Sequence, residues 1–427
     1  MINPVRKIIF AGIPLLTLLG ILESLLYIID YRGTSIADIQ STSGFQQNAY
    51  VQRRDRILGN WFLEKDNQFS SNPYLLARGF HDQSFTKDPN QKRRYFALGG
   101  STTYGSPFEH QAKGFPQRIE ETLNQHSTDN WEIINLGVAG MDSASFPKII
   151  EEISSYQAEG ILIYAGNNEI RGALTAQCSN PYRIGIEKQV NRLRTIQLMR
   201  DQFRRFSNVT VHFDHLAERQ DDCMKREVAN IQSLPPVYPE RYPLRSDAHY
   251  QMVLQQFQDH LQRSIDLASQ QRLKVFLAIP PINLLEPPAD QTWNTQLPPE
   301  TESQLQQRLQ DDSIDWKQLT ILDPTFALAS HQYGKELIDN ENALGLEYLQ
   351  RSVSQDLLSK RITPELQLVI RNLCNDNPTI HCIDISAAFK QNLNEKLADD
   401  DLFEDFCHPT FDKGTTLIAD QFIQAMQ

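Results

Sequence analysis

Short, nearly continuous apolar runs alternate along the chain with longer segments whose apolar residues recur at helical spacing. The apolar runs cover residues 95–98, 131–136, 160–165, 273–279 and 380–385. Helical spacing marks segments 114–126 and 145–156, and helix is expected from the last run onward. Strands without a polar face, separated by helices, are typical of a parallel sheet covered on both sides. The pattern therefore predicts an α/β fold: a three-layer α/β/α sandwich with a parallel five-stranded sheet.

Two long stretches interrupt this alternation. Residues 172–245 are polar, with a proline-rich break, and we expect them to form a cap beside the cleft. Residues 286–375 lie between the fourth and fifth strands. Inside them, residues 323–356 resemble one tetratricopeptide repeat, with one residue deleted and no Trp at its start. A lone repeat cannot form a solenoid, so packing on the main domain is favoured, and a groove for a protein partner is the alternative.

The N-terminal segment 8–29 is apolar apart from three residues, Thr17, Glu23 and Ser24. About 20 apolar residues are enough to span a bilayer core. Arg6 and Lys7 precede the run, which would keep the N-terminus in the cytoplasm and send the rest across. No A-x-A cleavage site follows, which favours a retained anchor over a cleaved signal peptide.

These features predict a domain organisation and a location. Residues 1–31 would form a single-pass anchor in the inner (cytoplasmic) membrane, and residues 32–93 a connector and entry loop. Residues 94–427 would form the main domain on the extracytoplasmic side, with the insertions 172–245 and 286–375.

Charge and cysteine usage narrow the function classes. The 427-residue chain has a net charge of −12, and its basic residues are scattered, which argues against a nucleic-acid partner. The five cysteines form no CxxC pair, and the HxxH of His212 and His215 lacks the acidic residue of a zinc-protease motif. We therefore expect no metal site. In an exported domain, Cys374 with Cys382 and Cys178 with Cys223 are plausible disulfides, although the sequence leaves the pairing open.

The first candidate for chemistry is Ser101, on a tight glycine turn. It follows Gly99 and Gly100 at the end of the first strand, and a helix comes next. Ligands of open α/β sheets sit at that edge, and amides of such a turn can face a developing oxyanion. A loop that only turns the chain is the structural alternative.

A second candidate is the pair Asp405 and His408, three residues apart near the C-terminus. On a tight loop this spacing lets the carboxylate reach the imidazole Nδ1–H, while Nε2 accepts a proton from a serine. A loop histidine beside a solvated aspartate is the alternative. Cys407 lies between them, but nothing nearby in sequence would lower its pKa, so a buried inert thiol is favoured over a nucleophile.

Two further motifs follow the second and third strands, at the same sheet edge as Ser101. They are Asn135-Leu136-Gly137-Val138-Ala139-Gly140 and Gly166-Asn167-Asn168-Glu169. A glycine amide from the first and the Asn168 side chain from the second could join the Ser101 amide as oxyanion donors.

The four blocks GGST, NxGxxG, GxNE and DxxH, in this order and strand context, resemble the SGNH (GDSL-like) hydrolase family over about residues 79–170 and 376–425. The resemblance implies a flavodoxin-like fold and ester hydrolysis through an acyl-serine, without metal or organic cofactor. It maps a catalytic triad onto Ser101, His408 and Asp405. It maps the oxyanion hole onto Ser101, Gly140 and Asn168, with Gly140 preferred to Gly137 on the family's spacing.

The chain departs from the family pattern at Gly100 and Glu169, where Asp is usual in both places. The departure at Gly100 leaves the triad intact, and Glu169 is expected to support loop geometry. Residues 286–375 resemble the helical insertion of membrane-anchored bacterial relatives with tetratricopeptide-like helices.

The favoured hypothesis is a membrane-anchored, extracytoplasmic serine esterase that acts on O-acyl, especially O-acetyl, esters of carbohydrate. One alternative is an O-acyltransferase of an envelope polysaccharide, with a sugar hydroxyl in place of water. Another is a non-catalytic envelope scaffold that binds a protein partner through its helical insertion.

Overall fold

A computed structural model describes most of the chain: residues 4–29, 61–71, 80–106, 114–177, 195, 198, 226, 247–294, 296–310, 314–392 and 401–427. Three predictions lie outside these residues. They are the pairing of Cys178 with Cys223, the HxxH of His212 and His215, and nearly all of the cap 172–245.

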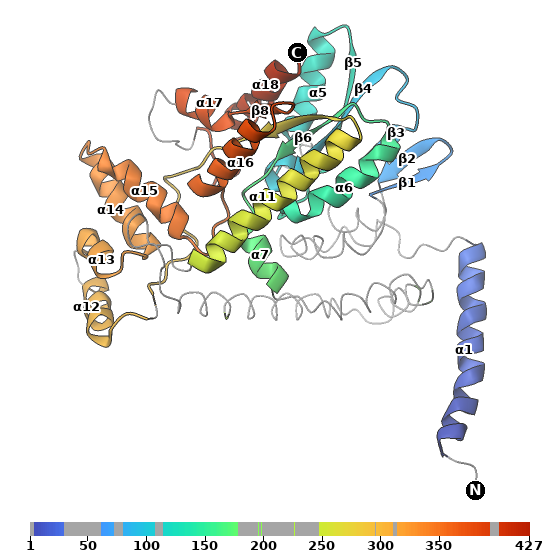
Figure 1. The fold of residues 1–427 in the computed structure, drawn as a ribbon, viewed down its shortest axis with the longest axis horizontal. Helices are drawn as coiled ribbons and strands as arrows, with labels where there is room; N and C mark the ends of the chain where they lie inside the picture. Colours follow the sequence, from blue (N-terminus) through green and yellow to red (C-terminus); the bar gives the residue numbers. More distant parts are fainter. Residues whose placement is uncertain are drawn as a thin grey trace.

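The centre of the molecule is a five-stranded parallel sheet (Figure 1). Its strands are β4 (Lys92–Gly99), β5 (Asn130–Asn135), β6 (Gly160–Tyr164), β7 (Lys274–Ala278) and β8 (His381–Ile383). Their order is β5-β4-β6-β7-β8, and each neighbouring pair is parallel. This is the flavodoxin-like order 2-1-3-4-5. The five predicted strands and the parallel sheet are confirmed.

Helices cover both faces of the sheet. Successive residues of a strand point to opposite faces, so they pack against different layers of helices. Phe96 and Leu98 of β4 pack with the apolar residues of α6 (Phe146–Ile153), α11 (Asp247–Gln270) and α16 (Pro364–Asp376). Tyr95 and Ala97 pack with α5 (Phe115–His126), α17 (Ile385–Asn392) and α18 (Lys413–Met426). The predicted three-layer sandwich is therefore present. Short helices border its loops: α4 (Ser101–Tyr104), η4 (Ser143–Ser145), η5 (Ser154–Tyr156) and α7 (Glu169–Gln177).

The segment predicted as a connector contains a second, antiparallel sheet. Its strands are β1 (Phe62–Lys65), β2 (Gln68–Ser71) and β3 (Ser84–Thr86). Asp66 and Asn67 join β1 to β2 with φ of 52° and 60°, the backbone of a type I′ hairpin turn. Phe62, Phe69 and Phe85 bury their rings against Tyr156. These strands were not predicted, although an Asp-Asn turn between runs containing Phe is a hairpin signal.

The stretch between β7 and β8 is helical, as predicted. It contains α12 (Pro299–Leu309), α13 (Trp316–Leu322), α14 (Ala327–Asp339) and α15 (Leu344–Gln355), followed by α16 on the sheet. We use the name "helical insertion" for residues 286–363, which exclude α16. Helices α14 and α15 approach closely at two glycines, since a Cβ on Gly345 would lie 2.7 Å from the carbonyl oxygen of Gly334. The likeness to a tetratricopeptide repeat stays a prediction.

The two ends of the helical insertion are fastened together at its base. The Asp356 carboxylate accepts hydrogen bonds from the backbone N–H groups of Ala289 and Asp290, at 2.8 and 2.9 Å. Arg361 donates from Nη1 to the carbonyl oxygens of Asn283 and Glu286. The chain therefore enters and leaves the helical insertion at one place.

The predicted membrane anchor is wrong, and with it the single-pass topology and the location derived from it. A helix, α1 (Pro4–Ile28), does form over the N-terminal run. Across the residues placed in the structure, however, no helix is both long enough and apolar enough to cross a bilayer. Pro14 lies inside α1, and the Glu23 carboxylate accepts hydrogen bonds from the backbone N–H and hydroxyl of Thr195. This helix carries a polar contact where the anchor interpretation required lipid.

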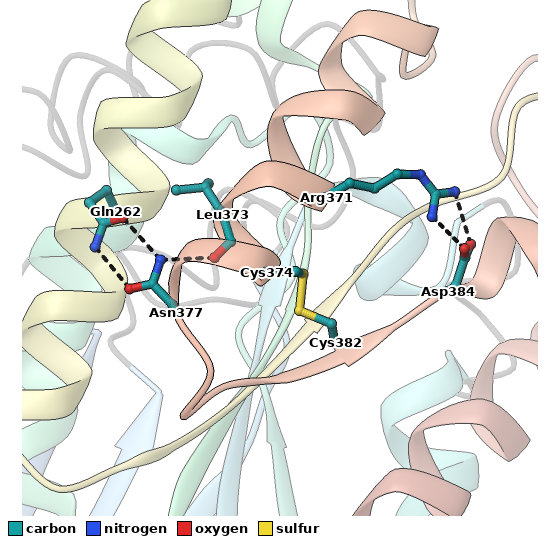
Figure 2. The surroundings of a disulfide bond; sticks show 7 residues. All are labelled: Gln262, Arg371, Leu373, Cys374, Asn377, Cys382 and Asp384. Carbon is teal, nitrogen blue, oxygen red and sulfur yellow. Dashed lines mark hydrogen bonds and ion pairs between the residues drawn. A yellow bond between two sulfur atoms is a disulfide. The ribbon is translucent and has the colours of Figure 1, made fainter.

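A disulfide joins the last turn of α16 to strand β8. It links Cys374 to Cys382, one of the two pairs that the sequence suggested. Figure 2 shows that side-chain contacts flank it. Asn377 exchanges hydrogen bonds with Gln262 of α11, and Arg371 forms a 2.6 Å ion pair with Asp384. These contacts fix the turn between α16 and the edge strand of the sheet.

We predict that replacing both cysteines, as Cys374→Ser with Cys382→Ser, lowers the free energy of unfolding by about 2.5 kcal/mol. The bridge closes a loop with a sequence separation of 8, and its loss returns that loop's entropy to the unfolded chain. Urea unfolding with and without dithiothreitol measures the effect. Without reductant the double variant should unfold at a lower urea concentration than the wild type, and with dithiothreitol the two midpoints should converge. Equal midpoints for the two proteins without reductant would contradict the prediction.

Candidate active site

Ser101 lies at the carboxyl end of β4, between β5 and β6 in the sheet, where α4 begins. Gly99, two residues before Ser101, has to be a glycine, since a Cβ there would lie 2.5 Å from the carbonyl oxygen of Tyr164 in the neighbouring strand. Asn135, at the end of β5, holds the turn from the other side by donating from Nδ2 to the carbonyl oxygen of Thr103 at 2.8 Å. The serine is therefore held on a turn that two adjacent strands support.

The structure brings Ser101, His408 and Asp405 into one hydrogen-bonded chain. Ser101 Oγ lies 2.6 Å from His408 Nε2, and His408 Nδ1 lies 2.7 Å from Asp405 Oδ2. With Nδ1 protonated, the imidazole donates to the carboxylate and the serine hydroxyl donates to Nε2. Ser101 and His408 are both buried. This arrangement can move the serine proton to the imidazole while the carboxylate stabilises the resulting cation.

Asp405 and His408 belong to a closed loop, residues 401–410, which we call the catalytic loop. Asp405 Oδ1 accepts hydrogen bonds from the backbone N–H groups of Cys407 and His408, each at 2.9 Å. Asn283, beyond the end of β7, donates to the Asp405 carbonyl oxygen at 2.8 Å. Burial alone would raise the pKa of Asp405, but the bonds from His408 and the backbone amides hold that pKa below its ordinary value. The carboxylate therefore stays ionised and keeps the imidazole oriented.

Gly140 and Asn168 come together beside the serine turn. Gly140 has a φ of +80°, in a turn closed by the hydrogen bond from the Met141 N–H to the Val138 carbonyl oxygen. Asn168 donates one amide N–H to the Met141 carbonyl oxygen at 3.0 Å. A Cβ on Gly100 would lie only 2.4 Å from Asn168 Nδ2, so the Asn168 amide rests directly against the residue before Ser101. The absence of a side chain at Gly100 permits this approach.

Gly137, the other glycine of the NxGxxG block, has a different place. Its N–H donates to Asn135 Oδ1 at 2.8 Å, and its Cα faces the backbone of Tyr104. The single N–H of Gly137 is therefore already used inside the fold and is not available to a ligand oxygen.

Glu169 joins the two loops that carry the amide donors. It is buried, and its carboxyl accepts hydrogen bonds from the N–H and hydroxyl of Ser143, three residues after Gly140. Burial, with a smaller effect from the charge of Asp142, raises the pKa of Glu169 to about 8. At neutral pH the side chain is therefore protonated and ties one loop to the other. This agrees with the expected role in loop geometry.

Residues that the sequence analysis missed support the site from behind. The Ile362 N–H donates to Asn167 Oδ1 at 2.9 Å, which fixes the residue before Asn168. Asn283 and Arg361 connect the catalytic loop to the base of the helical insertion. Asn283 follows the carboxyl end of a strand, a position that could have suggested a role at the site. Nothing in the sequence around Arg361 suggests such a role.

One group of side chains in the described residues has the spacing of a metal site: Asp405, Cys407 and His408, whose ligand atoms lie within 4.8 Å of one another. Both nitrogens of His408 are engaged, by Asp405 and by Ser101. Cys407 is buried, and burial raises its pKa well above the ordinary value, which disfavours the thiolate that binds metal or attacks a substrate. These residues fit a proton relay and not a metal site.

We predict that Glu169→Gln gains stability relative to the wild type as the pH rises from about 5 to 8. The folded-state pKa is raised above the ordinary 4.5, so the unfolded chain loses this proton first. The wild type is then destabilised by up to about 1.4 kcal/mol per pH unit, until the folded protein also ionises. Glutamine cannot ionise and escapes this loss. Thermal unfolding at half-unit pH steps is the measurement, and parallel stability curves for the two proteins would contradict the prediction.

No protein-family model and no curated protein matches the chain. Among solved structures it is similar to the acetyl xylan esterase AlAXEase, at 14% identity and a TM-score of 0.36, covering 78% of this chain and 100% of that one. It is also similar to a GDSL-like lipase from Bacteroides thetaiotaomicron, at 11% identity and a TM-score of 0.35, covering 80% and 91%. A third similar structure is the acetylxylan esterase Axe2 from Geobacillus stearothermophilus, at 12% identity and a TM-score of 0.36, covering 78% of this chain and 94% of that one. These values are too low to assign a family, so a functional proposal has to rest on the geometry of the site.

Proposed function

We propose that this chain is a serine hydrolase of the SGNH type that cleaves carboxylic esters through an acyl-serine intermediate. The observation that carries the proposal is the hydrogen-bonded chain Ser101–His408–Asp405, with distances of 2.6 and 2.7 Å, at the carboxyl end of β4. As the alcohol part of the substrate we propose a carbohydrate, with a short acyl group such as acetyl.

The first half of the reaction forms the acyl-enzyme. His408 Nε2 takes the hydroxyl proton of Ser101 as Oγ bonds to the ester carbonyl carbon. The carbonyl oxygen becomes an oxyanion, which the N–H groups of Ser101 and Gly140 and the Asn168 amide stabilise. The N–H of Ser101, as the first residue of α4, has no acceptor inside that helix. His408 then gives its proton to the leaving alcohol oxygen as the acyl carbon–oxygen bond breaks.

The second half returns the enzyme to its starting state. A water molecule attacks the acyl carbon and passes a proton to His408. The bond from the acyl carbon to Ser101 Oγ then breaks, the proton returns to Oγ, and the carboxylic acid leaves. Asp405 keeps the imidazole in one orientation through both halves and stabilises its cationic form.

The test uses a fluorophosphonate probe and p-nitrophenyl acetate on the full chain. We predict that the probe labels Ser101, located by peptide mass spectrometry. Ser101→Ala and His408→Ala should each lower kcat/KM by about 10⁴-fold or more. Ser155→Ala, an exposed serine before β6, is the matched control and should behave as the wild type. Absence of probe labelling in folded wild-type protein would overturn the proposal. If the probe labels Ser101 but the protein does not turn over p-nitrophenyl acetate, acyl transfer to another acceptor becomes the better hypothesis.

A second prediction concerns the oxyanion hole. In Gly100→Ala the new Cβ would displace the Asn168 amide, which lies 2.4 Å from that position. We expect kcat to fall by about 10²–10³, the usual loss for one oxyanion donor, with little change in melting temperature. Asn168→Ala should cause a similar loss, and the double variant should be no worse than either single one, because both remove the same interaction. Additive losses would show that Gly100 acts by another route.

A further inference from the structure

A cavity of about 180 Å³ lies beside the catalytic loop. Its walls come from the two ends of the helical insertion, residues 286–291 and 356–361, and from Phe406 of the catalytic loop. A larger hollow of about 390 Å³, between α6 and α11, has none of the triad or oxyanion residues in its wall. The wall of the smaller cavity contains none of those residues either, but its Phe406 lies two residues from His408, which links this cavity to the reacting groups.

Phe406 connects this cavity to His408. It lies between Asp405 and Cys407 in sequence, and its ring centroid is 5.6 Å from that of His408. In the proposed reaction His408 hands its proton to the departing alcohol. A group that packs on Phe406 is therefore close to the imidazole, where the alcohol part of an ester has to lie.

The wall combines an aromatic ring with donors and acceptors. The Lys360 ammonium lies 5.0 Å from the centroid of the Phe406 ring, and the side chains of Gln291 and Glu286 line the same space. An acyl chain or a lipid tail would leave these polar groups without partners. Sites with an aromatic surface and a few polar groups bind ligands that have both an apolar face and hydrogen-bonding groups.

Arg361 adds a buried donor without a protein partner. Its Nη1 is committed to the carbonyl oxygens of Asn283 and Glu286, which fixes the guanidinium plane. Its Nη2 is buried and has no hydrogen-bond partner within the described part of the chain. Because Nη2 is closed off from solvent, Arg361 shapes the wall, and the donors that face a ligand come from other residues.

The charges of the wall favour a neutral ligand over an anion. Two cationic side chains, Lys360 and Arg361, are balanced by the carboxyl groups of Glu286 and Asp356. Asp356 has its oxygens engaged by backbone N–H groups, so it serves the fold. The groups left for a ligand are the donors of Lys360 and Gln291 and the acceptor of Glu286. A sugar ring matches this set, because its hydroxyls both donate and accept and its C–H face can pack on an aromatic ring.

We propose that this cavity binds the sugar unit that carries the ester, and that Phe406 and Lys360 determine the preference for carbohydrate esters. The proposal rests on the proposed function and assigns a role to the helical insertion: its two ends build the alcohol subsite.

The test compares two kinds of acetate ester on the full chain. One is ethyl acetate, whose alcohol part is small and has no further hydroxyl group to bind in the cavity. The other is a set of methyl glucopyranoside, galactopyranoside and xylopyranoside, each with one O-acetyl group. The readout is the ratio of kcat/KM for the best pyranoside to that for ethyl acetate. We expect Phe406→Leu and Lys360→Met each to lower this ratio by about five- to ten-fold. Lys317→Met, an exposed lysine on α13 outside the cavity, is the matched control and should keep the wild-type ratio.

Fluorophosphonate labelling of Ser101 in the same proteins separates the two hypotheses. Labelling in every variant, with a lowered ratio only for Phe406→Leu and Lys360→Met, supports the subsite. Labelling with an unchanged ratio, or a wild type without preference for any acetylated pyranoside, overturns the subsite and leaves the hydrolase proposal intact. Failure to label the wild type overturns the proposed function itself. As a second readout, the acetyl-free methyl pyranosides should inhibit ethyl acetate hydrolysis in the wild type and less so in Lys360→Met.

Discussion

The hydrogen bond between Ser101 and His408 joins two residues 307 positions apart, and the whole candidate site depends on it. A 2.6 Å contact over that separation requires the turn at Ser101 and the catalytic loop to be held by larger elements. Helix α5 follows the first and α18 follows the second, and the rings of Phe115 and Phe422 stack between them at 5.3 Å. Arg118 of α5 donates to the carbonyl oxygen of Phe411 and to Thr416 Oγ1. The layer of helices on that face of the sheet is therefore what keeps the His408 imidazole opposite the Ser101 hydroxyl.

Much of this arrangement could be predicted from the sequence, because it follows from the sheet. Buried parallel strands are apolar on both faces and stand out as continuous runs, so the ends of β4 to β8 were placed to within three residues. The carboxyl ends of parallel strands share one edge. Polar blocks after β4, β5 and β6 had to meet there, and Ser101, Gly140 and Asn168 do so. The short spacing of Asp405 and His408 in a loop was enough to suggest their contact.

The rest could not be predicted, because it depends on contacts that leave no periodic trace. Arg361 is buried only because the base of the helical insertion folds over it. The strands β1 to β3 are three or four residues long, too short for alternation to be convincing. The N-terminal run was interpreted from its composition alone, whereas the structure shows Glu23 in a polar contact with Thr195. Length and apolar content describe a segment, but they do not say what it packs against.

The fastening of the two ends of the helical insertion has a consequence for how such a protein can change. Asp356 and Arg361 hold the incoming and outgoing segments of the chain side by side. The distance between the two ends is therefore the same whatever the size of the insertion between them. Helices α12 to α15 extend from this point as an appendage (Figure 1). Lengthening, shortening or exchanging these helices is therefore equivalent, for the α/β domain, to changing the length of a loop. The entropic cost of closing a loop grows only with the logarithm of its length. New recognition surfaces could thus be acquired through recombination at this junction, without disturbing the chemistry next to it.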